Sequence, residues 1–157
     1  MTGPSDPVAD RLAILELTAN LGLLVDAREW AEIEALFTDP VVIDYTSLNG
    51  GEPQTLHPAE VVGGWQRMLD HLDATQHLIA NQVIELDGDR ASCGANVQGT
   101  HVLANASGGP LWTVGGRYDY KLARTADGWR ITGLTLTVRW ATGNQHIMTL
   151  AAEKGGK

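Results

Sequence analysis

Apolar residues recur at helical spacing over the first part of the chain. Asp6 can cap the free amides at the start of a helix, and Pro7 suits the first helical position. At steps of three to four residues there follow Val8, Leu12, Leu15, Ala19 and Leu23. Asp26 lies eighteen residues after Val8, and at about 3.6 residues per turn it returns to the same face. The pattern therefore predicts a long helix whose buried stripe ends at the carboxylate of Asp26.

After this helix, short apolar runs alternate with turn-forming residues. Apolar side chains at three- and four-residue steps predict a short helix over Trp30–Phe37, which Pro40 blocks from continuing. Val41–Tyr45 has the composition of a short strand. The stretch 47–58 is rich in Gly, Pro and Asn, which favours a loop over a pocket mouth. A third helix is predicted over about 59–72.

From about residue 75 the pattern changes to period two, which is typical of strands with one buried face. Asp87-Gly88 and Asp127-Gly128 lie at two of the junctions, and both dipeptides favour hairpin turns. The four predicted strands, joined as an antiparallel meander, cover residues 76–86, 90–104, 111–124 and 129–141. Glycines inside these strands favour bends. Helices followed by a bent meander predict an α+β domain, with the helices covering the concave face of a curved sheet.

Composition is that of a globular domain with an acidic surface. The chain has 157 residues, of which 43% are hydrophobic, enough for one domain over 1–157. The formal net charge is -8, and no cluster of Lys and Arg interrupts the acidic background. Nucleic acid is therefore not expected as a partner.

Nothing in the chain predicts export or membrane insertion. No stretch approaches the roughly 20 apolar residues of a membrane helix, and the start lacks the basic and apolar regions of a signal peptide. The predicted location is therefore cytoplasmic. Cys93 is the only cysteine, so an internal disulfide is excluded, and we expect it to be a small buried filler. The last residues, 153–157, are predicted to be a frayed tail.

Three polar residues fall on faces that the patterns predict to be buried. Asp26 ends the helical stripe, His77 opens the first long strand, and His101 lies on the inward face of the second. A buried carboxylate is costly unless another group pairs with it, and antiparallel pairing could bring both histidines to the same concave surface. An imidazole held by a carboxylate keeps one tautomer and can remove a proton near neutral pH.

Each of these residues alone also has a structural interpretation. Asp26 could cap the helix that follows it, and an inward histidine is more often a hydrogen-bonded core residue than a catalyst. The combination of the three is what favours chemistry over structure.

Further side chains are candidates for contact with a bound molecule. Asn81 shares strand parity with His77 and is either a pocket hydrogen-bond donor or a satisfied strand residue. Tyr118 lies on the same predicted strand face as Trp112. Tryptophans can stack on an aromatic substrate, although they also fill cores through size alone. The tryptophans in question are Trp30, Trp65, Trp112 and Trp140.

The order of these residues resembles the SnoaL-like branch of the NTF2-like superfamily. The pattern consists of Asp26 at a helix end, Trp30, Tyr45 in a short strand, and the strand histidines His77 and His101. The resemblance spans about residues 8–142 and is greatest to the scytalone dehydratases, in which a helix-end Asp, a Tyr and two strand histidines line the cavity. One position departs from those enzymes, because Val25 stands where they carry a second Tyr.

The resemblance implies a cone-shaped α+β barrel, in which a curved mixed sheet wraps around N-terminal helices and encloses a deep apolar pocket. It implies a homodimer or homotrimer built through the open sheet. The implied activity is that of a lyase without cofactor or metal, a dehydratase that acts on a small hydrophobic cyclic carbonyl or polyketide-like compound.

Roles for individual residues also follow from the resemblance. His77 or His101 would take the proton α to the carbonyl and return it to the departing hydroxyl. Asp26 would orient the imidazole, and Tyr45 would polarise the carbonyl. The hexachlorocyclohexane dehydrochlorinases, which are siblings of the dehydratases, pair a helix-end Asp with a strand His. That similarity favours Asp26 and His77 as the working pair.

The pattern leaves two other functions open. A polyketide cyclase or a double-bond isomerase on the same fold also begins with removal of a proton next to a carbonyl. The domain could instead bind a ligand, or serve in assembly, without catalysis, since a fold does not determine a function.

Overall fold

The computed structural model describes residues 6–156 of the chain. In chain order its elements are α1 (Pro7–Ala27), α2 (Trp30–Glu34), β1 (Phe37–Asp44), α3 (Thr46–Asn49), β2 (Gln54–Leu56), α4 (Pro58–Leu69), β3 (Ala74–Asp87), β4 (Arg90–Val102), β5 (Leu111–Thr125), β6 (Gly128–Gly143) and α5 (His146–Gly155). Residues 1–5, to which the signal-peptide prediction applies, and Lys157 of the predicted tail lie outside the described residues.

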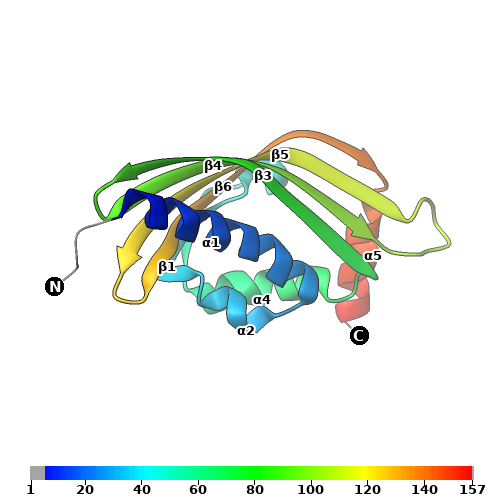
Figure 1. The fold of residues 1–157 in the computed structure, drawn as a ribbon. Coiled ribbons are helices and arrows are strands. Elements are labelled where there is room, and N and C mark those ends of the chain that lie inside the picture. Colours follow the sequence, from blue (N-terminus) through cyan, green and yellow to red (C-terminus); the bar gives the residue numbers. More distant parts are fainter. Residues whose placement is uncertain (1–5, 157) are drawn as a thin grey trace.

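In the described part of the chain the strands form one six-stranded sheet in the order β2-β1-β6-β5-β4-β3. Strands β3 to β6 pair antiparallel with their chain neighbours, which confirms the predicted meander. Strand β1 runs parallel to β6, so the sheet is mixed. The sheet curves strongly, and α1, α2 and α4 lie on its concave side (Figure 1). The predicted α+β class is confirmed.

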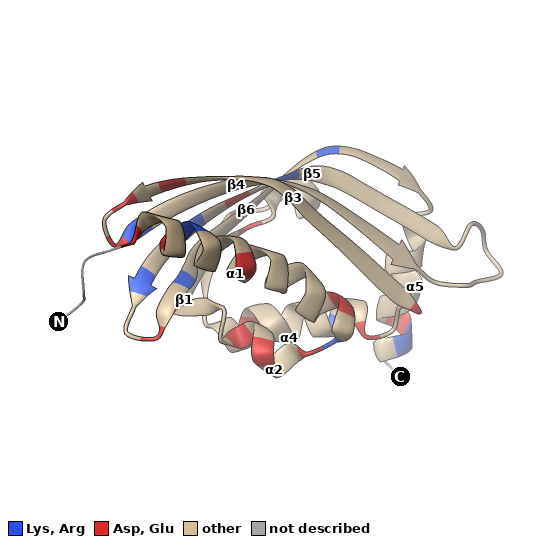
Figure 2. Ribbon diagram, viewed as in Figure 1, with Lys and Arg blue, Asp and Glu red and all other residues tan. Residues whose placement is uncertain are grey.

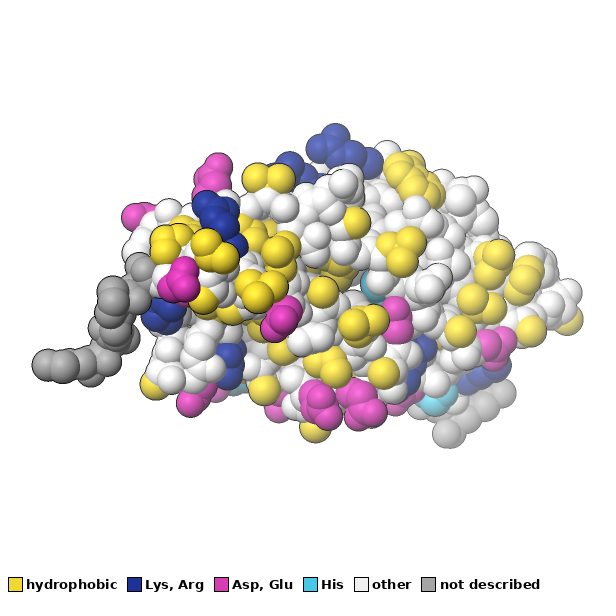
Figure 3. Space-filling view, in the orientation of Figure 1, with side chains coloured by type: hydrophobic (Ala, Val, Ile, Leu, Met, Phe, Trp, Pro, Cys, Tyr) yellow, Lys and Arg dark blue, Asp and Glu magenta, His cyan; other side chains and the backbone are white. Residues whose placement is uncertain are grey.

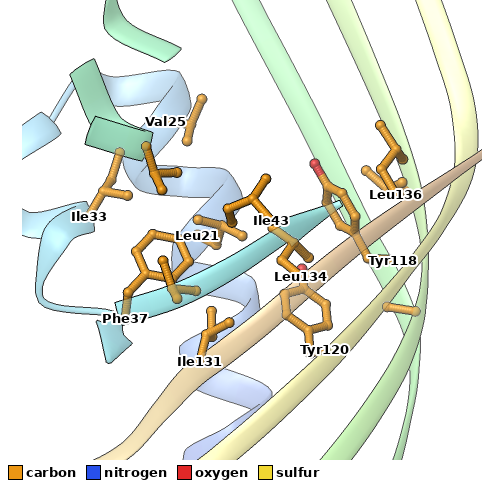
Figure 4. Close-up of a cluster of buried hydrophobic side chains, with 14 of the residues drawn as sticks. Leu21, Val25, Ile33, Phe37, Ile43, Tyr118, Tyr120, Ile131, Leu134 and Leu136 are labelled. Carbon is orange, nitrogen blue, oxygen red and sulfur yellow. The ribbon is translucent and has the colours of Figure 1, made fainter. Parts of the chain in front are cut away.

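An apolar cluster fills the space between the sheet and the helices. Figure 4 shows Leu21 and Val25 of α1 near Ile43 of β1, with Tyr118 and Leu136 of the long strands beyond it. All five residues are more than nine-tenths buried. Burial of an aliphatic side chain of this size contributes roughly 1.5–3 kcal/mol relative to exposure, so this cluster is a main source of stability.

Helix α1 begins as predicted but buries a different face. Asp6 accepts hydrogen bonds from the amides of Val8 and Ala9, which confirms the predicted N-cap. The predicted buried stripe is wrong, because Val8 is 75% exposed and Leu23 is 64% exposed. The buried face consists of Asp10, Ile14, Leu17, Thr18, Leu21, Gly22 and Val25.

The physical reason is that α1 carries apolar residues on two faces, so spacing alone does not decide which face meets the core. In the space-filling view, apolar side chains are exposed over α1 (Figure 3). Asp26 therefore does not point into the core. It lies on the flank of the helix that faces β3.

Regular structure extends into segments that were predicted to lack it. The predicted loop at 47–58 contains α3 and β2, and β2 pairs antiparallel with β1. The predicted helix over Trp30–Phe37 is shorter, because Phe37 already belongs to β1. Most of the predicted tail at 153–157 is helical, because α5 extends to Gly155. Earlier in the same helix, Ile147 and Ala151 are fully buried.

A buried ion pair ties the start of α1 to the strands β5 and β6. Asp10 is 7% exposed, and its two carboxylate oxygens accept hydrogen bonds from Arg124, each at 2.7 Å. The indole of Trp129 donates to the same carboxylate at 3.0 Å. The hydrogen bonds from Arg124 and then Trp129 hold the pKa of Asp10 below its usual value. In the view of Figure 2, basic and acidic residues gather at this end of the sheet.

Replacing Arg124 by methionine is expected to lower the melting temperature by several degrees, because the Asp10 carboxylate stays buried without its main partner. Arg130→Met is the matched control, since Arg130 donates to the neighbouring carbonyl of Trp129. Thermal unfolding followed by circular dichroism measures both variants. Equal shifts in the two variants would show that the ion pair adds nothing.

Candidate active site

Gly22 lets α1 lie directly against β3. A Cβ atom at this position would stand 3.2 Å from Cδ1 of Ile79 and 3.3 Å from the carbonyl oxygen of His77, which is tighter than ordinary contact. The close approach brings the last turn of α1 to the strand. Asp26, on the flank of that turn, therefore reaches both the backbone and the side chain of His77.

Asp26 and His77 form a hydrogen-bonded pair. Nδ1 of His77 lies 2.7 Å from Oδ1 of Asp26, and the backbone N–H of His77 donates to Oδ2, also at 2.7 Å. The hydroxyl of Thr75 donates to Oδ1 at 2.9 Å. Because a carboxylate can only accept, the proton of the neutral imidazole sits on Nδ1. Nε2 keeps its lone pair and bonds to no group within residues 6–156.

The pair is largely shielded from water and its carboxylate is ionised. The side chains of His77 and Asp26 are 14% and 20% exposed. Burial alone would raise the pKa of Asp26, but the hydrogen bonds from the side chain and backbone of His77 outweigh it and hold the pKa below its ordinary value. At neutral pH Asp26 is thus a fixed negative charge behind the imidazole.

His101 lies beside this pair in a different state. Its ring centre is 5.9 Å from that of His77, and the two rings are nearly perpendicular. Nδ1 of His101 lies 3.2 Å from the carbonyl oxygen of Trp112, so Nδ1 carries the proton. Burial, and then the neighbouring His77, lower the pKa of His101 to about 4. At neutral pH this imidazole is uncharged and offers Nε2 as an acceptor.

Gly99 makes room for both rings. It pairs with His77 across the sheet, and a Cβ atom there would stand 3.2 Å from Cδ2 of His77 and 3.5 Å from Cε1 of His101. A side chain there would crowd the ring of His77, whereas the ring of His101 is at ordinary contact distance. The absence of a side chain at Gly99 is therefore needed for the His77 ring to take its position in the site.

Two phenols also face the cavity. The hydroxyl oxygens of Tyr45 and Tyr118 are 3.2 Å apart, and their rings are stacked with centres 6.5 Å apart. Trp65 stacks on the ring of Tyr45. Burial raises the pKa of both phenols, so both stay protonated at neutral pH. One hydroxyl donates to the other, which leaves the second O–H free for a bound molecule.

These groups line an apolar cavity of about 160 Å³. Its other walls come from α1, α3, α4, α5 and the long strands, and include Leu21, Val25, Leu48, Met68, Ile79, Val97, Val114, Leu136, Gln145 and Met148. No Lys, Arg or Glu is among the lining residues in the described part of the chain. Since an apolar cavity of about 150 Å³ can hold benzene, a neutral compound of about one ring fits here.

The cavity brings together most of the residues that the sequence singled out. His77, His101, Tyr45, Trp112, Tyr118 and Trp65 line it. Asp26 stands behind His77 and reaches the cavity through that imidazole.

Asn81 lies elsewhere, and its predicted face is wrong. A bulge between Ala80 and Val83 shifts the register of β3, and the backbone of Asn81 takes a positive φ of 59°. The side chain therefore turns to the outer face of the sheet, where it accepts a hydrogen bond from Asn96 at 3.0 Å. Of the two interpretations of Asn81, the structure supports a strand residue whose side chain is hydrogen-bonded on the sheet, and not a donor in the pocket.

Two tryptophans also lie away from the cavity. The indole of Trp30 donates to Asp70 at 2.9 Å, where α2 packs against α4. A register shift between Gly115 and Gly116 turns Trp140 to the outer face, where its ring occupies the space of the missing side chain of Gly115. Trp30, predicted to contact substrate, therefore does not line this cavity.

Several lining residues were not singled out from the sequence. Gln145 and Met148 were missed because the segment around α5 carried no assigned element, although Ile147 and Ala151 stand one helical turn apart and signal a helix. Thr75 was missed because no spacing rule identifies a strand hydroxyl that bonds to a distant carboxylate.

The described residues hold no second site for metal or thiolate chemistry. Within residues 6–156, no group of three or more His, Cys, Asp or Glu side chains is placed to hold a metal ion. None of the described helices is both long and apolar enough to cross a membrane. Cys93 is buried as predicted, and burial raises the pKa of its thiol to about 11, so it is not a thiolate at neutral pH.

A curved sheet over helices, with an apolar cavity and a buried Asp–His pair, is the arrangement expected of an NTF2-like domain. The chain belongs to the SnoaL-like domain family, whose model matches residues 6–135. The resemblance inferred from the sequence is thus confirmed. The uncharacterized protein Rv2910c of Mycobacterium tuberculosis is 30% identical over 125 residues, which are 79% of this chain and 82% of that protein.

Solved structures share the fold over almost the whole chain. Kfla4162 from Kribbella flavida superposes with a TM-score of 0.85 and 31% identity, covering 93% of this chain and 99% of that one. A proposed aromatic ring hydroxylase from Novosphingobium aromaticivorans gives 0.78 and 27%, covering 92% and 99%. A proposed scytalone dehydratase from the same organism gives 0.73 and 17%, covering 88% and 89%, which shows the fold alone.

Proposed function

We propose that this protein is a lyase that removes water, or a similar leaving group, from a small, neutral, cyclic carbonyl compound by proton transfer. One observation carries the proposal: Nδ1 of His77 is held by the Asp26 carboxylate, while Nε2 faces an apolar cavity without a partner among the described residues. That is the arrangement of a general base that is kept in one tautomer.

In the proposed reaction, Nε2 of His77 takes a proton from the carbon next to the carbonyl. The electrons of the broken C–H bond form the new double bond, and the C–O bond to the hydroxyl breaks. The imidazolium then gives its proton to the departing hydroxyl, which leaves as water. Asp26 stabilises the imidazolium between the two transfers, because the carboxylate is ionised and 2.7 Å away.

The hydroxyl pair and His101 have supporting parts in this proposal. The free O–H of Tyr45 or Tyr118 donates to the substrate carbonyl oxygen, on which negative charge develops. His101 is uncharged at neutral pH and cannot supply the proton, so its Nε2 accepts a hydrogen bond from the substrate hydroxyl. Of the two histidines that the sequence offered as base, the geometry supports His77.

The test uses 3-hydroxycyclohexanone, a single-ring β-hydroxy ketone that suits the size of the cavity. Elimination gives a conjugated ketone that absorbs strongly in the ultraviolet, which the starting ketone does not, and that has lost the mass of water. The reaction is repeated in deuterated water, because a base that works removes and exchanges the α proton. Close cyclic analogues, with one or two rings, extend the series.

The possible results separate the three functions. Loss of water catalysed by the protein supports the lyase. Exchange of the α proton without loss of water, with the carbon skeleton either unchanged or rearranged, assigns the protein to the isomerases or cyclases instead. Binding of these ketones, seen by calorimetry, without exchange or product would leave a ligand-binding domain and refute the lyase. The expected homodimer or homotrimer stays a prediction, to be measured by light scattering.

A further inference from the structure

The Asp26 carboxylate is held by a second chain of hydrogen bonds besides the one to His77. An Nη1 proton of Arg28 is donated to Oγ1 of Thr75 at 2.8 Å, and Oγ1 of Thr75 donates to Oδ1 of Asp26 at 2.9 Å. A threonine hydroxyl has only one proton. Since Oγ1 accepts from Arg28, its own proton is directed to the carboxylate.

The backbone of Arg28 is shaped to allow this contact. Arg28 ends α1 in the left-handed conformation, with φ at 62°, where glycine is the common residue because a side chain is sterically strained there. The side chain makes use of the position, because Nη1 also donates to the carbonyl oxygen of Val25 at 2.9 Å. The guanidinium lies 5.8 Å from the ring centre of Trp30.

The guanidinium of Arg28 interacts with residues of three elements around the site. Arg28 belongs to the end of α1, Thr75 to β3, and Asp70, whose charge acts on Arg28, to the end of α4. Asp70 in turn accepts the hydrogen bond from Trp30. The position of the Asp26 carboxylate therefore depends on contacts that lie outside the cavity.

We propose that Arg28 and Thr75 are positioning residues, which fix the Asp26 carboxylate so that it holds His77 with Nδ1 protonated and Nε2 turned to the cavity. The inference rests on the proposed function in so far as that function uses His77 as its base. Neither residue lines the cavity. Both act through Asp26, so their effect is on the state of the pair and not on substrate contact.

The state of the pair can be measured on the protein alone by nuclear magnetic resonance. The carboxyl carbon of Asp26 reports its pKa, and the ring nitrogens of His77 report which of them carries the proton. In Thr75→Val the hydroxyl is lost with little change of shape, and the pKa of Asp26 is expected to rise by about one unit, with a smaller share of the Nδ1–H tautomer. Thr75→Ser restores the hydroxyl and should restore both values.

Arg28 is tested with a pair of variants that separates stability from positioning. Arg28→Gly suits the left-handed backbone, so the urea concentration at the midpoint of unfolding should fall only by what the loss of two hydrogen bonds causes. The Asp26 pKa and the His77 tautomer should still change as in Thr75→Val. Arg28→Lys keeps a charged donor and should preserve the Asp26 pKa and the His77 tautomer in part.

Thr100→Val is the matched control for Thr75→Val, since Thr100 bonds to Thr113 on neighbouring strands.

The outcomes are decisive for each residue. An Asp26 pKa and a His77 tautomer that are unchanged in both Thr75→Val and Arg28→Gly overturn the proposal, and a change in Thr75→Val alone overturns the role of Arg28. If the Asp26 pKa and the His77 tautomer change as much in Thr100→Val as in Thr75→Val, the whole proposal is overturned. Once a substrate is verified, turnover should fall about tenfold in Thr75→Val and recover in Thr75→Ser. If wild type turns over no substrate while the resonance results hold, the proposed function fails and the positioning role stands.

Discussion

Replacing His77 by glutamine is expected to lower turnover of a verified substrate by about 10²–10⁴-fold, because the general base of the proposed reaction is lost. Glutamine is close in size and polarity, so the fold should be retained. Asp26→Asn should cause a loss in the same range, since an amide no longer fixes the Nδ1–H tautomer or stabilises the imidazolium. Steady-state kinetics at saturating substrate measure both variants.

The matched control for this prediction is His146→Gln, because His146 is exposed at the start of α5 and its ring contacts no group of the Asp26–His77 pair. Full activity in either His77→Gln or Asp26→Asn, with His146→Gln also active, would exclude the pair from catalysis. The double variant should lose no more than the worse single variant, because the two residues act as a unit.

The parts of the fold that the sequence predicted correctly rest on strong local signals. Asp6 and Pro7 start α1, and the Asp-Gly dipeptides separate the long strands, because capping and turn geometry depend on a few neighbouring residues. The stripe from Val8 to Leu23 failed for the opposite reason. Which apolar face of α1 is buried depends on the sheet beneath it, and that is a tertiary property.

The candidate site divides in the same way. The pairing of Asp26 with His77 could be anticipated, since a carboxylate at a helix end and a histidine at a strand start can meet when the helix packs on that strand. Arg28 and Thr75 could not, because their roles depend on a left-handed backbone and on a contact between distant segments. Asn81 was misplaced because a bulge, invisible to simple alternation, reverses its face.

Acidification from pH 6.5 to pH 4 is expected to cost the folded protein up to about 3 kcal/mol through His101 alone. Burial, followed by the nearby His77, lowers the pKa of His101 to about 4, whereas an unfolded histidine has a pKa near 6.5. Between these values the unfolded chain binds a proton that the folded chain does not bind. Stability therefore falls as the pH decreases through this window, and the contribution of His101 is fully present only above it.

Urea unfolding of wild type and His101→Gln at several pH values between 7 and 4 measures this effect. The variant should be less stable at pH 7, because the bond to the Trp112 carbonyl is disturbed, yet its stability should vary less with pH. Asp26, whose pKa is lowered, begins to lose its stabilising contribution near the acid end of this window, but it does so in both proteins and leaves the difference between them to His101. His57 is exposed, and Asp39 raises its pKa, which acts in the opposite direction and equally in both proteins. Identical pH slopes in wild type and His101→Gln would mean that His101 is not held uncharged, and it could then supply a proton in the proposed reaction.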